Sequence, residues 1–171
     1  YSNKEKKYIN KNQDKIKSAT LSKTKSGKYY LSVLVVRESE KLLKNTNKII
    51  GIDVGIKTFI VGSDGSIYEN IKTRRNNEEK LKRLHQLLSR KQKGSNNRNK
   101  ARIKLARYYE KLNNQKEYYL HSITNQLLNE NQVIVMEDLN IKGMMKNHNL
   151  AKSIQELSLY RFKEILKYKA D

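Results

Sequence analysis

The sequence predicts an α/β fold in which helices pack on a mixed β-sheet. Short aliphatic runs that are typical of buried strands occur at 48–54 and again at 132–137. Between them, apolar residues recur with the period of an amphipathic helix. A strand that follows a helical crossover commonly returns parallel to an earlier strand, so 132–137 is expected beside 48–54.

The N-terminal part of the chain predicts a β-hairpin. Residues 15–23 and 29–36 are strand-like, and the five residues 24–28, which include a glycine, indicate a hairpin loop. Because a lone hairpin is marginal in water, these strands are expected to complete an upstream β-barrel domain. The polar stretch 37–47 is interpreted as a linker. The predicted division of the chain is 1–45 and 46–171.

Three strands in a meander open the second unit. The strand 48–54 carries Asp53 near its end, and 57–62 and 67–70 follow it. The turn 63–66 contains an Asp-Gly pair, which favours an antiparallel connection because glycine adopts a positive φ at little cost. Asp64, in this turn, is interpreted as structural.

Helices occupy most of the remaining chain. A helix is predicted over 76–92, a break at 94–97, and a long helix over about 98–130. A last helix is expected to start at Ser153, where Glu156 gives the spacing of a capping box. The residues predicted to face the core are Leu81, Leu84, Leu87, Leu88, Leu105, Tyr108, Leu112, Tyr119, Ile123, Leu127, Leu159, Phe162 and Leu166.

Two of the predicted strands end in acids. Asp53 closes one apolar run, and Glu137, followed by Asp138, closes the other. A single such acid is most simply a polar residue at a strand end, but two on neighbouring parallel strands would meet at one edge. Paired carboxylates select Mg²⁺ or Mn²⁺, and two such ions support in-line cleavage of phosphodiesters. Asp53 and Glu137 are therefore the candidate catalytic and metal-binding residues, and Asp138 is interpreted mainly as a turn or capping residue.

The charge of the chain predicts a polyanionic partner. Lys and Arg number 37 against 17 Asp and Glu, for a net charge of +20. Residues 71–120 hold 16 of these cations and four Glu, too few acids to pair them along the helices. The candidate nucleic-acid-binding residues are Arg74, Arg75, Arg90, Lys91, Arg98, Lys100 and Arg102.

Other site chemistries find little support in the composition. The chain has no Cys, so neither disulfides nor a Cys-based zinc site can form within it. His85, His121 and His148 have no metal-ligand spacing. No apolar run approaches the roughly 20 residues that cross a membrane, and an intracellular protein is expected. Both ends of the sequence suggest a fragment of a longer chain.

The acid motifs resemble those of a known family. The segments IGIDVG at 50–55, VMEDLN at 135–140, KGM at 142–144 and LAKSI at 150–154 are similar to the RuvC-type, RNase H-like core of the TnpB (OrfB) proteins, which bacterial transposons encode. The similarity covers the chain from about Lys48 to its end.

This resemblance implies an RNA-guided DNA endonuclease of the bacterial cytoplasm and nucleoid. It implies guide RNA and target DNA as partners. It also implies two Mg²⁺ or Mn²⁺ ions, held by Asp53 as the first acid and Glu137 as the second. It also implies that helical insertions interrupt the RNase H-like sheet. A zinc ribbon and a third acid, an Asp, would follow beyond this sequence, so the motifs leave open whether this segment is active by itself.

Two other functions remain open at this point. A non-catalytic RNA- or DNA-binding module would need only the positive charge. An actin-like ATPase begins with a similar Asp-x-Gly turn, although the seven glycines of the chain are not clustered into phosphate loops.

Overall fold

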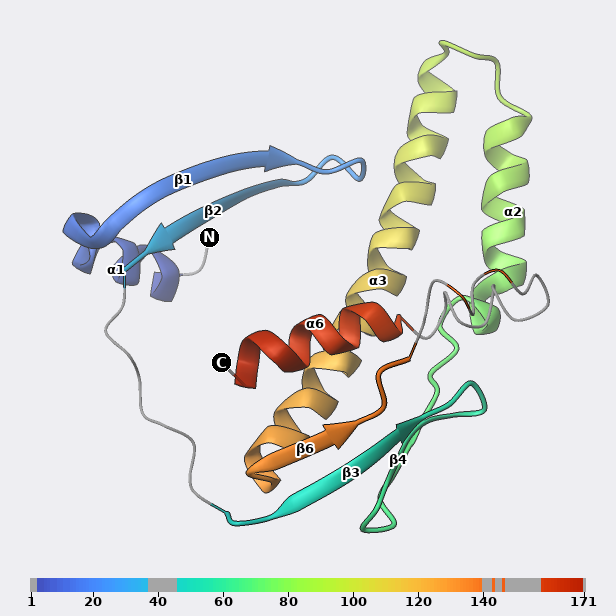
Figure 1. The fold of residues 1–171 in the computed structure, drawn as a ribbon. Helices are drawn as coiled ribbons and strands as arrows, with labels where there is room; N and C mark the ends of the chain where they lie inside the picture. The colour runs from blue at the N-terminus through green and yellow to red at the C-terminus, as the bar shows by residue number, and fades with distance from the viewer. Residues whose placement is uncertain (1–2, 37–45, 140–142, 144–145, 147–157, 171) are drawn as a thin grey trace.

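The computed structural model describes residues 3–36, 46–139, 143, 146 and 158–170 (Figure 1). Its centre is a four-stranded mixed sheet in the order β5-β4-β3-β6. The strands are β3 (Ile49–Val54), β4 (Thr58–Gly62), β5 (Ile67–Glu69) and β6 (Val133–Met136). The first three form the predicted antiparallel meander, and β6 pairs in parallel with β3, as the crossover rule predicted.

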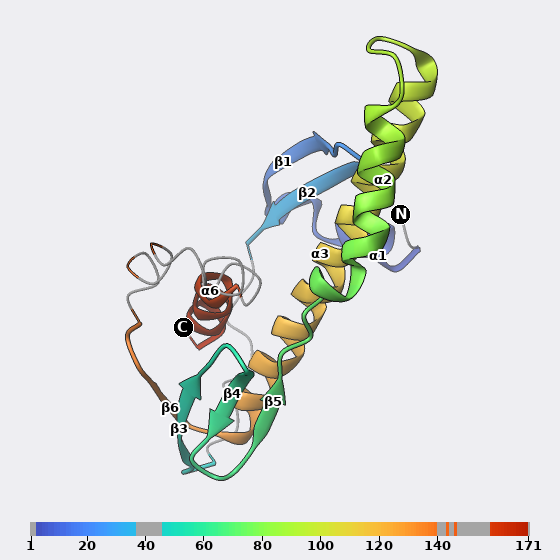
Figure 2. The same cartoon turned by 90° about the vertical axis from the view of Figure 1, so that its right-hand side faces the viewer.

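Two helices cover one face of this sheet. They are the C-terminal half of α3 (Asn96–Glu130) and α6 (Leu159–Ala170), which lie on the same side of the strands in Figures 1 and 2. Ile50 and Ile60 of the sheet pack with Leu127 of α3 and Phe162 of α6 in the main core. Phe59 meets Phe162 edge to face, with ring centroids 5.4 Å apart. The apolar residues that alternate along the strands and those that recur with the helical period therefore pack together in one layer.

Polar contacts fix α6 against α3. Arg161 makes a two-pronged ion pair with Glu117, in which Nε and Nη2 lie 3.1 and 3.0 Å from Oε2. At the other end of α6, Lys169 Nζ donates to Thr124 Oγ1 at 2.8 Å and to Asn125 Oδ1 at 2.7 Å. Burial lowers the pKa of the Lys169 ammonium. These contacts set the axial position of α6, which apolar packing leaves less strictly defined.

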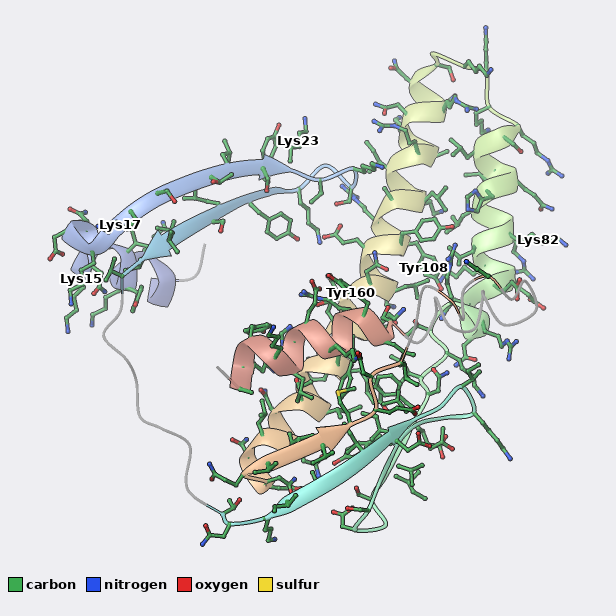
Figure 3. All side chains as sticks on the ribbon, in the orientation of Figure 1. Lys15, Lys17, Lys23, Lys82, Tyr108 and Tyr160 are labelled. Carbon is green, nitrogen blue, oxygen red and sulfur yellow. The ribbon has the colours of Figure 1, made fainter. Side chains whose placement is uncertain are left out.

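The N-terminal half of α3 forms a helical hairpin with α2 (Glu78–Ser89). Leu81 and Leu84 of α2 pack with Leu105 and Leu112 of α3 in a second, smaller cluster. Tyr108 points from α3 toward α2, where its hydroxyl bonds the Asn77 side chain (Figure 3). The helical hairpin thus has its own core and projects beyond the sheet.

Residues 3–36 form a separate arm. The helix α1 (Asn3–Lys11), which the sequence pattern did not predict, and a short 3₁₀ turn (Gln13–Lys15) precede β1 (Ile16–Lys23) and β2 (Tyr29–Val35). The strands pair antiparallel as predicted, with Leu21 opposite Leu31. That the hairpin belongs to a β-barrel, and that a domain boundary follows it, stay predictions.

The predicted core differs from the observed one at a few positions. Leu87 is exposed, because α2 packs on α3 through Leu81 and Leu84 and turns Leu87 to solvent. Ile165 of α6 is fully buried although it was not among the predicted core residues. The predicted linker 37–47 except its last two residues, and the predicted helix start at Ser153 and Glu156, lie outside the described residues. Among the described helices, none is long and apolar enough to cross a membrane.

Candidate metal centre on the open face of the sheet

Asp53 and Glu137 occupy corresponding positions on adjacent strands. β3 and β6 run parallel, and the last pair in their register joins Ile52 to Met136. Asp53 is the next residue of β3, and Glu137 directly follows the end of β6. Neighbouring strands lie about 4.8 Å apart, so the backbone brings the two acids side by side.

The two acids also share a face of the sheet. Ile52 is buried and Met136 packs against the main core, whereas Asp53 and Glu137 are exposed. Since successive side chains of a strand point to opposite faces, both carboxylates belong to the face away from α3 and α6, called the open face below. The arrangement that a shared site requires is therefore present, and the role of these acids as metal ligands stays a prediction.

Apolar side chains surround the acids on the open face. Val61 of β4 is paired with Asp53 on one side and with Ile67 of β5 on the other. Further along, Ile49 is 71% exposed and Val135 57% exposed. The row across the sheet therefore runs from apolar residues on β5 and β4 to the two acids on β3 and β6.

A serine and a tight turn fix the strand that carries Asp53. The Ser63 hydroxyl accepts from the Gly51 N–H at 3.0 Å, and the Ser63 N–H donates to the Gly51 carbonyl at 2.8 Å. In the turn, Asp64 Oδ1 accepts from the Ser66 N–H at 2.9 Å. The Ser66 hydroxyl and, after it, the Ser66 N–H lower the pKa of the Asp64 carboxyl. A Cβ on Gly62 would lie 2.5 Å from Asp64 Oδ1, so any larger residue there would displace the Asp64 side chain from its contact in the turn. The structural interpretation of Asp64 is confirmed.

Asp138 lies apart from the acid pair. Its Oδ1 accepts from Lys163 Nζ of α6 at 2.7 Å, and this ammonium holds the pKa of the Asp138 carboxyl below its usual range. The contact is with a helix of the covered face, as expected for the residue after Glu137. Asp138 therefore anchors the end of β6 to α6.

The carboxylates of Asp53 and Glu137 are the candidate metal ligands on the open face among the described residues. Among these residues, no group of three or more His, Asp or Glu side chains is close enough to hold a metal ion. His85 instead bonds the Tyr109 hydroxyl at 2.8 Å, and His121 lies 3.9 Å from Glu117. His148 lies outside the described residues. Hard oxygen donors on an exposed face suit Mg²⁺ or Mn²⁺, with room for water and substrate oxygens in the rest of the shell.

The predicted nucleic-acid-binding residues fall into two groups rather than one. Arg74 and Arg75 precede α2, whereas the others lie around the turn between α2 and α3. The 12 residues of α2 separate the groups by about 18 Å. In the second group, Arg98 Nη1 donates to the carbonyls of Leu88 and Lys91 at 3.0 and 3.1 Å. That guanidinium closes the C-terminal end of α2, so part of its hydrogen-bonding capacity is already used within the fold.

Contacts between the hairpin and α3 had no signal in the sequence. Glu110 of α3 accepts from Lys28 Nζ and from the Tyr30 hydroxyl, both at 2.9 Å. Together with Ser26, these neighbours lower the pKa of the Glu110 carboxyl to about 2. The residues are some 80 positions apart, and neither strand alternation nor helical period relates them.

Comparison of the sequence with known proteins identifies a family. The sequence model of the OrfB_IS605 family, described as "Probable transposase", matches residues 30–148. A protein of Streptomyces pristinaespiralis named "Putative RNA-guided DNA endonuclease" is 32% identical over 152 residues, which are 89% of this chain and 38% of that protein. InsQ of Escherichia coli K12, which carries the same description, is 33% identical over 77% of this chain and 33% of its own length.

An archaeal relative extends the similarity. The "TnpB-like protein MJ0751" of Methanocaldococcus jannaschii is 28% identical over 85% of this chain and 60% of its own length. The chain spans roughly a third of the length of the first two relatives, at 38% and 33%. The family match covers more than half of the chain, including both acids of the open face. The chain belongs to the TnpB (OrfB) family of transposon-encoded proteins.

Proposed function

We propose that the protein carrying this chain is an RNA-guided, divalent-metal-dependent DNA endonuclease, and that Asp53 and Glu137 hold its catalytic metal. The observation that carries the proposal is the parallel register of β3 and β6, which ends one residue before the two acids. The names of the relatives support a nuclease over an actin-like ATPase.

The strand order supports an RNase H-like, RuvC-type fold. Three antiparallel strands are followed, after the helices, by a strand added in parallel beside the first. In this arrangement one acid comes from the middle of the sheet and the other from the strand next to it. The α2–α3 hairpin is then a helical insertion between the two strands that carry the acids.

The chain's own residues would prepare the site in two ways. Asp53 and Glu137 hold two carboxylates beside each other on a face that is open to a polymeric substrate. Ser63 and the Gly62 turn keep β3 and β4 in register, which fixes the position of Asp53. A divalent ion bound there would polarise the scissile phosphate and lower the pKa of a bound water. In the family pattern that the sequence resembles, a third acid, an Asp, would join these two as a ligand of the metal.

The positive charge supports the nucleic-acid partners. A net charge of +20 exceeds what solubility needs and favours binding of guide RNA and target DNA. Such contacts release counterions, so affinity is expected to fall with salt with a slope of roughly 0.9 per phosphate neutralised on duplex DNA.

A non-catalytic nucleic-acid-binding protein is the second candidate. The observation that favours it is that, among the described residues, no third acid lies close enough to Asp53 and Glu137 to share a metal ion with them. In that case the charge would provide the whole function, and Mg²⁺ would have no effect on the DNA.

The test uses the complete protein with its guide RNA and matched DNA. Asp53→Ala and Glu137→Ala are expected to lower Mg²⁺-dependent cleavage by at least about a hundredfold while the affinities for RNA and DNA stay within about twofold. Asp138→Asn is the matched control, because it removes an adjacent acid that contacts α6, and it should cleave like the parent. Cleavage that survives both alanine substitutions would overturn the assignment of Asp53 and Glu137 as metal ligands. No metal-dependent cleavage by the parent would favour the second candidate.

A further inference from the structure

The loop of the N-terminal hairpin rests on the middle of α3 (Figure 1). Lys28 and Tyr30 both donate to Glu110 Oε1, and Arg107 Nε donates to the Ser26 carbonyl at 3.3 Å. Ser26 is buried in this contact. The loop therefore lies against the side of α3, and Glu110 forms an ion pair with Lys28.

Two shallow hollows lie on either side of this contact. One, of about 450 Å³, is lined by Lys28 and by α3 residues from Arg107 to Tyr118. The other, of about 820 Å³, is lined by loop residues including Lys25 and by α3 residues from Arg102 to Asn114. Glu110 lies between them and lines both. From Arg102 to Tyr118 the helix spans about 24 Å, which gives a surface of polymer length.

The first hollow follows one stripe of α3. Arg107, Lys111, Asn114, Gln115 and Tyr118 succeed one another by four, three, one and three residues, which places them on one side of the helix. Within the part of the chain that the structure describes, no hydrogen bond or ion pair engages the side chains of Lys111, Asn114 or Gln115. Tyr118 is 78% exposed. This stripe with Lys28 is called the loop–helix surface below.

The chemistry of the loop–helix surface matches a single nucleic-acid strand. Its ammonium and guanidinium groups suit phosphates, and the exposed Tyr118 ring offers a face for base stacking. The amides of Asn114 and Gln115 both donate and accept, which suits a 2′-hydroxyl that does the same. Glu110 is the acid that lines the hollow, and its charge is offset by Lys28.

We infer that the loop–helix surface binds a single-stranded segment of RNA, with phosphates against Lys111 and Arg107 and a base against Tyr118. This inference rests on the proposed function, in which the bound RNA is the guide. It adds a contact region on α3 to the two groups of basic residues at the ends of α2.

The test measures the affinity of the complete protein for single-stranded RNA, in an assay that does not depend on DNA cleavage. Tyr118→Ala is expected to weaken binding of a single-stranded RNA about five- to a hundredfold, whereas Tyr118→Phe, which keeps the ring, binds like the parent. Lys111→Ala should weaken binding and lower the salt slope by about 0.7, the value for one phosphate of a single strand. The controls are Tyr160→Ala and Lys82→Ala, which remove an exposed ring and a charge elsewhere (Figure 3).

Parallel binding measurements with single-stranded DNA test whether the surface distinguishes ribose from deoxyribose. Asn114→Ala should weaken binding of the RNA more than binding of single-stranded DNA of the same sequence. Equal losses on RNA and DNA would overturn the assignment to RNA. Unchanged RNA affinity in Tyr118→Ala and Lys111→Ala would overturn the site while leaving the Asp53 and Glu137 cleavage test intact. A parent protein that binds no RNA would overturn both this inference and the guide-RNA part of the proposed function.

Discussion

The two faces of the four-stranded sheet are built from alternate residues of the same strands and differ in what they touch. On the covered face, Ile50, Ile52 and Ile60 are buried against α3 and α6. On the open face, Asp53 and Glu137 are exposed among partly exposed aliphatic residues. One residue along a strand therefore separates a core contact from a candidate ligand.

This difference teaches where stability and chemistry reside. Burial of apolar surface contributes roughly 25 cal/mol per Å², so the covered face contributes far more to the free energy of unfolding than the open face. An acid on the open face can then hold its position through the backbone of a strand whose other face is anchored. Three pairs of substitutions and one single substitution test this division, from the largest expected effect to the smallest.

The largest effect is expected at Phe162, which is fully buried on α6 and meets Phe59 edge to face. Phe162→Ala should lower the free energy of unfolding by about 3–5 kcal/mol, because it removes a large ring and leaves a cavity. Chemical denaturation measures the change. The control is Tyr160→Ala on the same helix, which is 67% exposed and should change stability by no more than about 0.5 kcal/mol.

Neighbouring residues of β3 compare the two faces directly. Ile52→Ala should cost about 2–5 kcal/mol of unfolding free energy, since Ile52 belongs to the main core. Asp53→Asn, one residue further, should stay within about 0.5 kcal/mol because the side chain is exposed. Denaturation curves with similar losses for both variants would contradict the assignment of Asp53 to the open face.

The same comparison on β6 should give a smaller difference. Ile134→Thr places a hydroxyl against the main core and should cost about 1–3 kcal/mol. Val135→Thr keeps the branched shape on the open face, where Val135 is largely exposed, and should be nearly neutral. Melting temperatures of the two variants provide the measurement. A costly Val135→Thr would show that another part of the protein covers the open face.

The smallest effect concerns Asp138 and its partner on α6. Lys163→Gln removes the ammonium that holds the Asp138 pKa down, so this pKa should rise toward the ordinary value of 3.8. Because the carboxyl pKa is lowered in the folded state, the contact stabilises the fold above pH 3.8 and loses its effect as the pH falls through the folded-state value. An NMR titration of the Asp138 carboxyl measures both. An unchanged pKa in Lys163→Gln would contradict the contact.

The elements with a strong local signal were predicted closely. The aliphatic runs around Asp53 and before Glu137 became β3 and β6, and the Asp-Gly turn joined β4 to β5. The long helix, predicted from about 98 to 130, spans Asn96–Glu130. The structure adds Ser95 as its cap, whose hydroxyl accepts from the Arg98 N–H at 3.1 Å. These features depend on residues close in sequence, and that is why pattern and turn chemistry were sufficient to predict them.

Predictions that depended on distant contacts were less complete. Leu87 has the helical spacing of a core residue but lies in solvent, because only part of α2 meets α3. The seven candidate basic residues were expected around one break, yet α2 separates Arg74 and Arg75 from the rest. Arg98 also closes the end of α2, a role that depends on carbonyls seven and ten residues away.

By itself, the sequence determined the strands, the main helices, the positive charge and the two acids, because alternation, period and composition are local properties of the chain. The tertiary structure decided that β6 lies beside β3 in the register that brings Asp53 and Glu137 together, and that the hairpin loop rests on Glu110. Register and docking depend on how surfaces from distant parts of the chain fit, and one residue of slip in a strand would move every side chain to the other face.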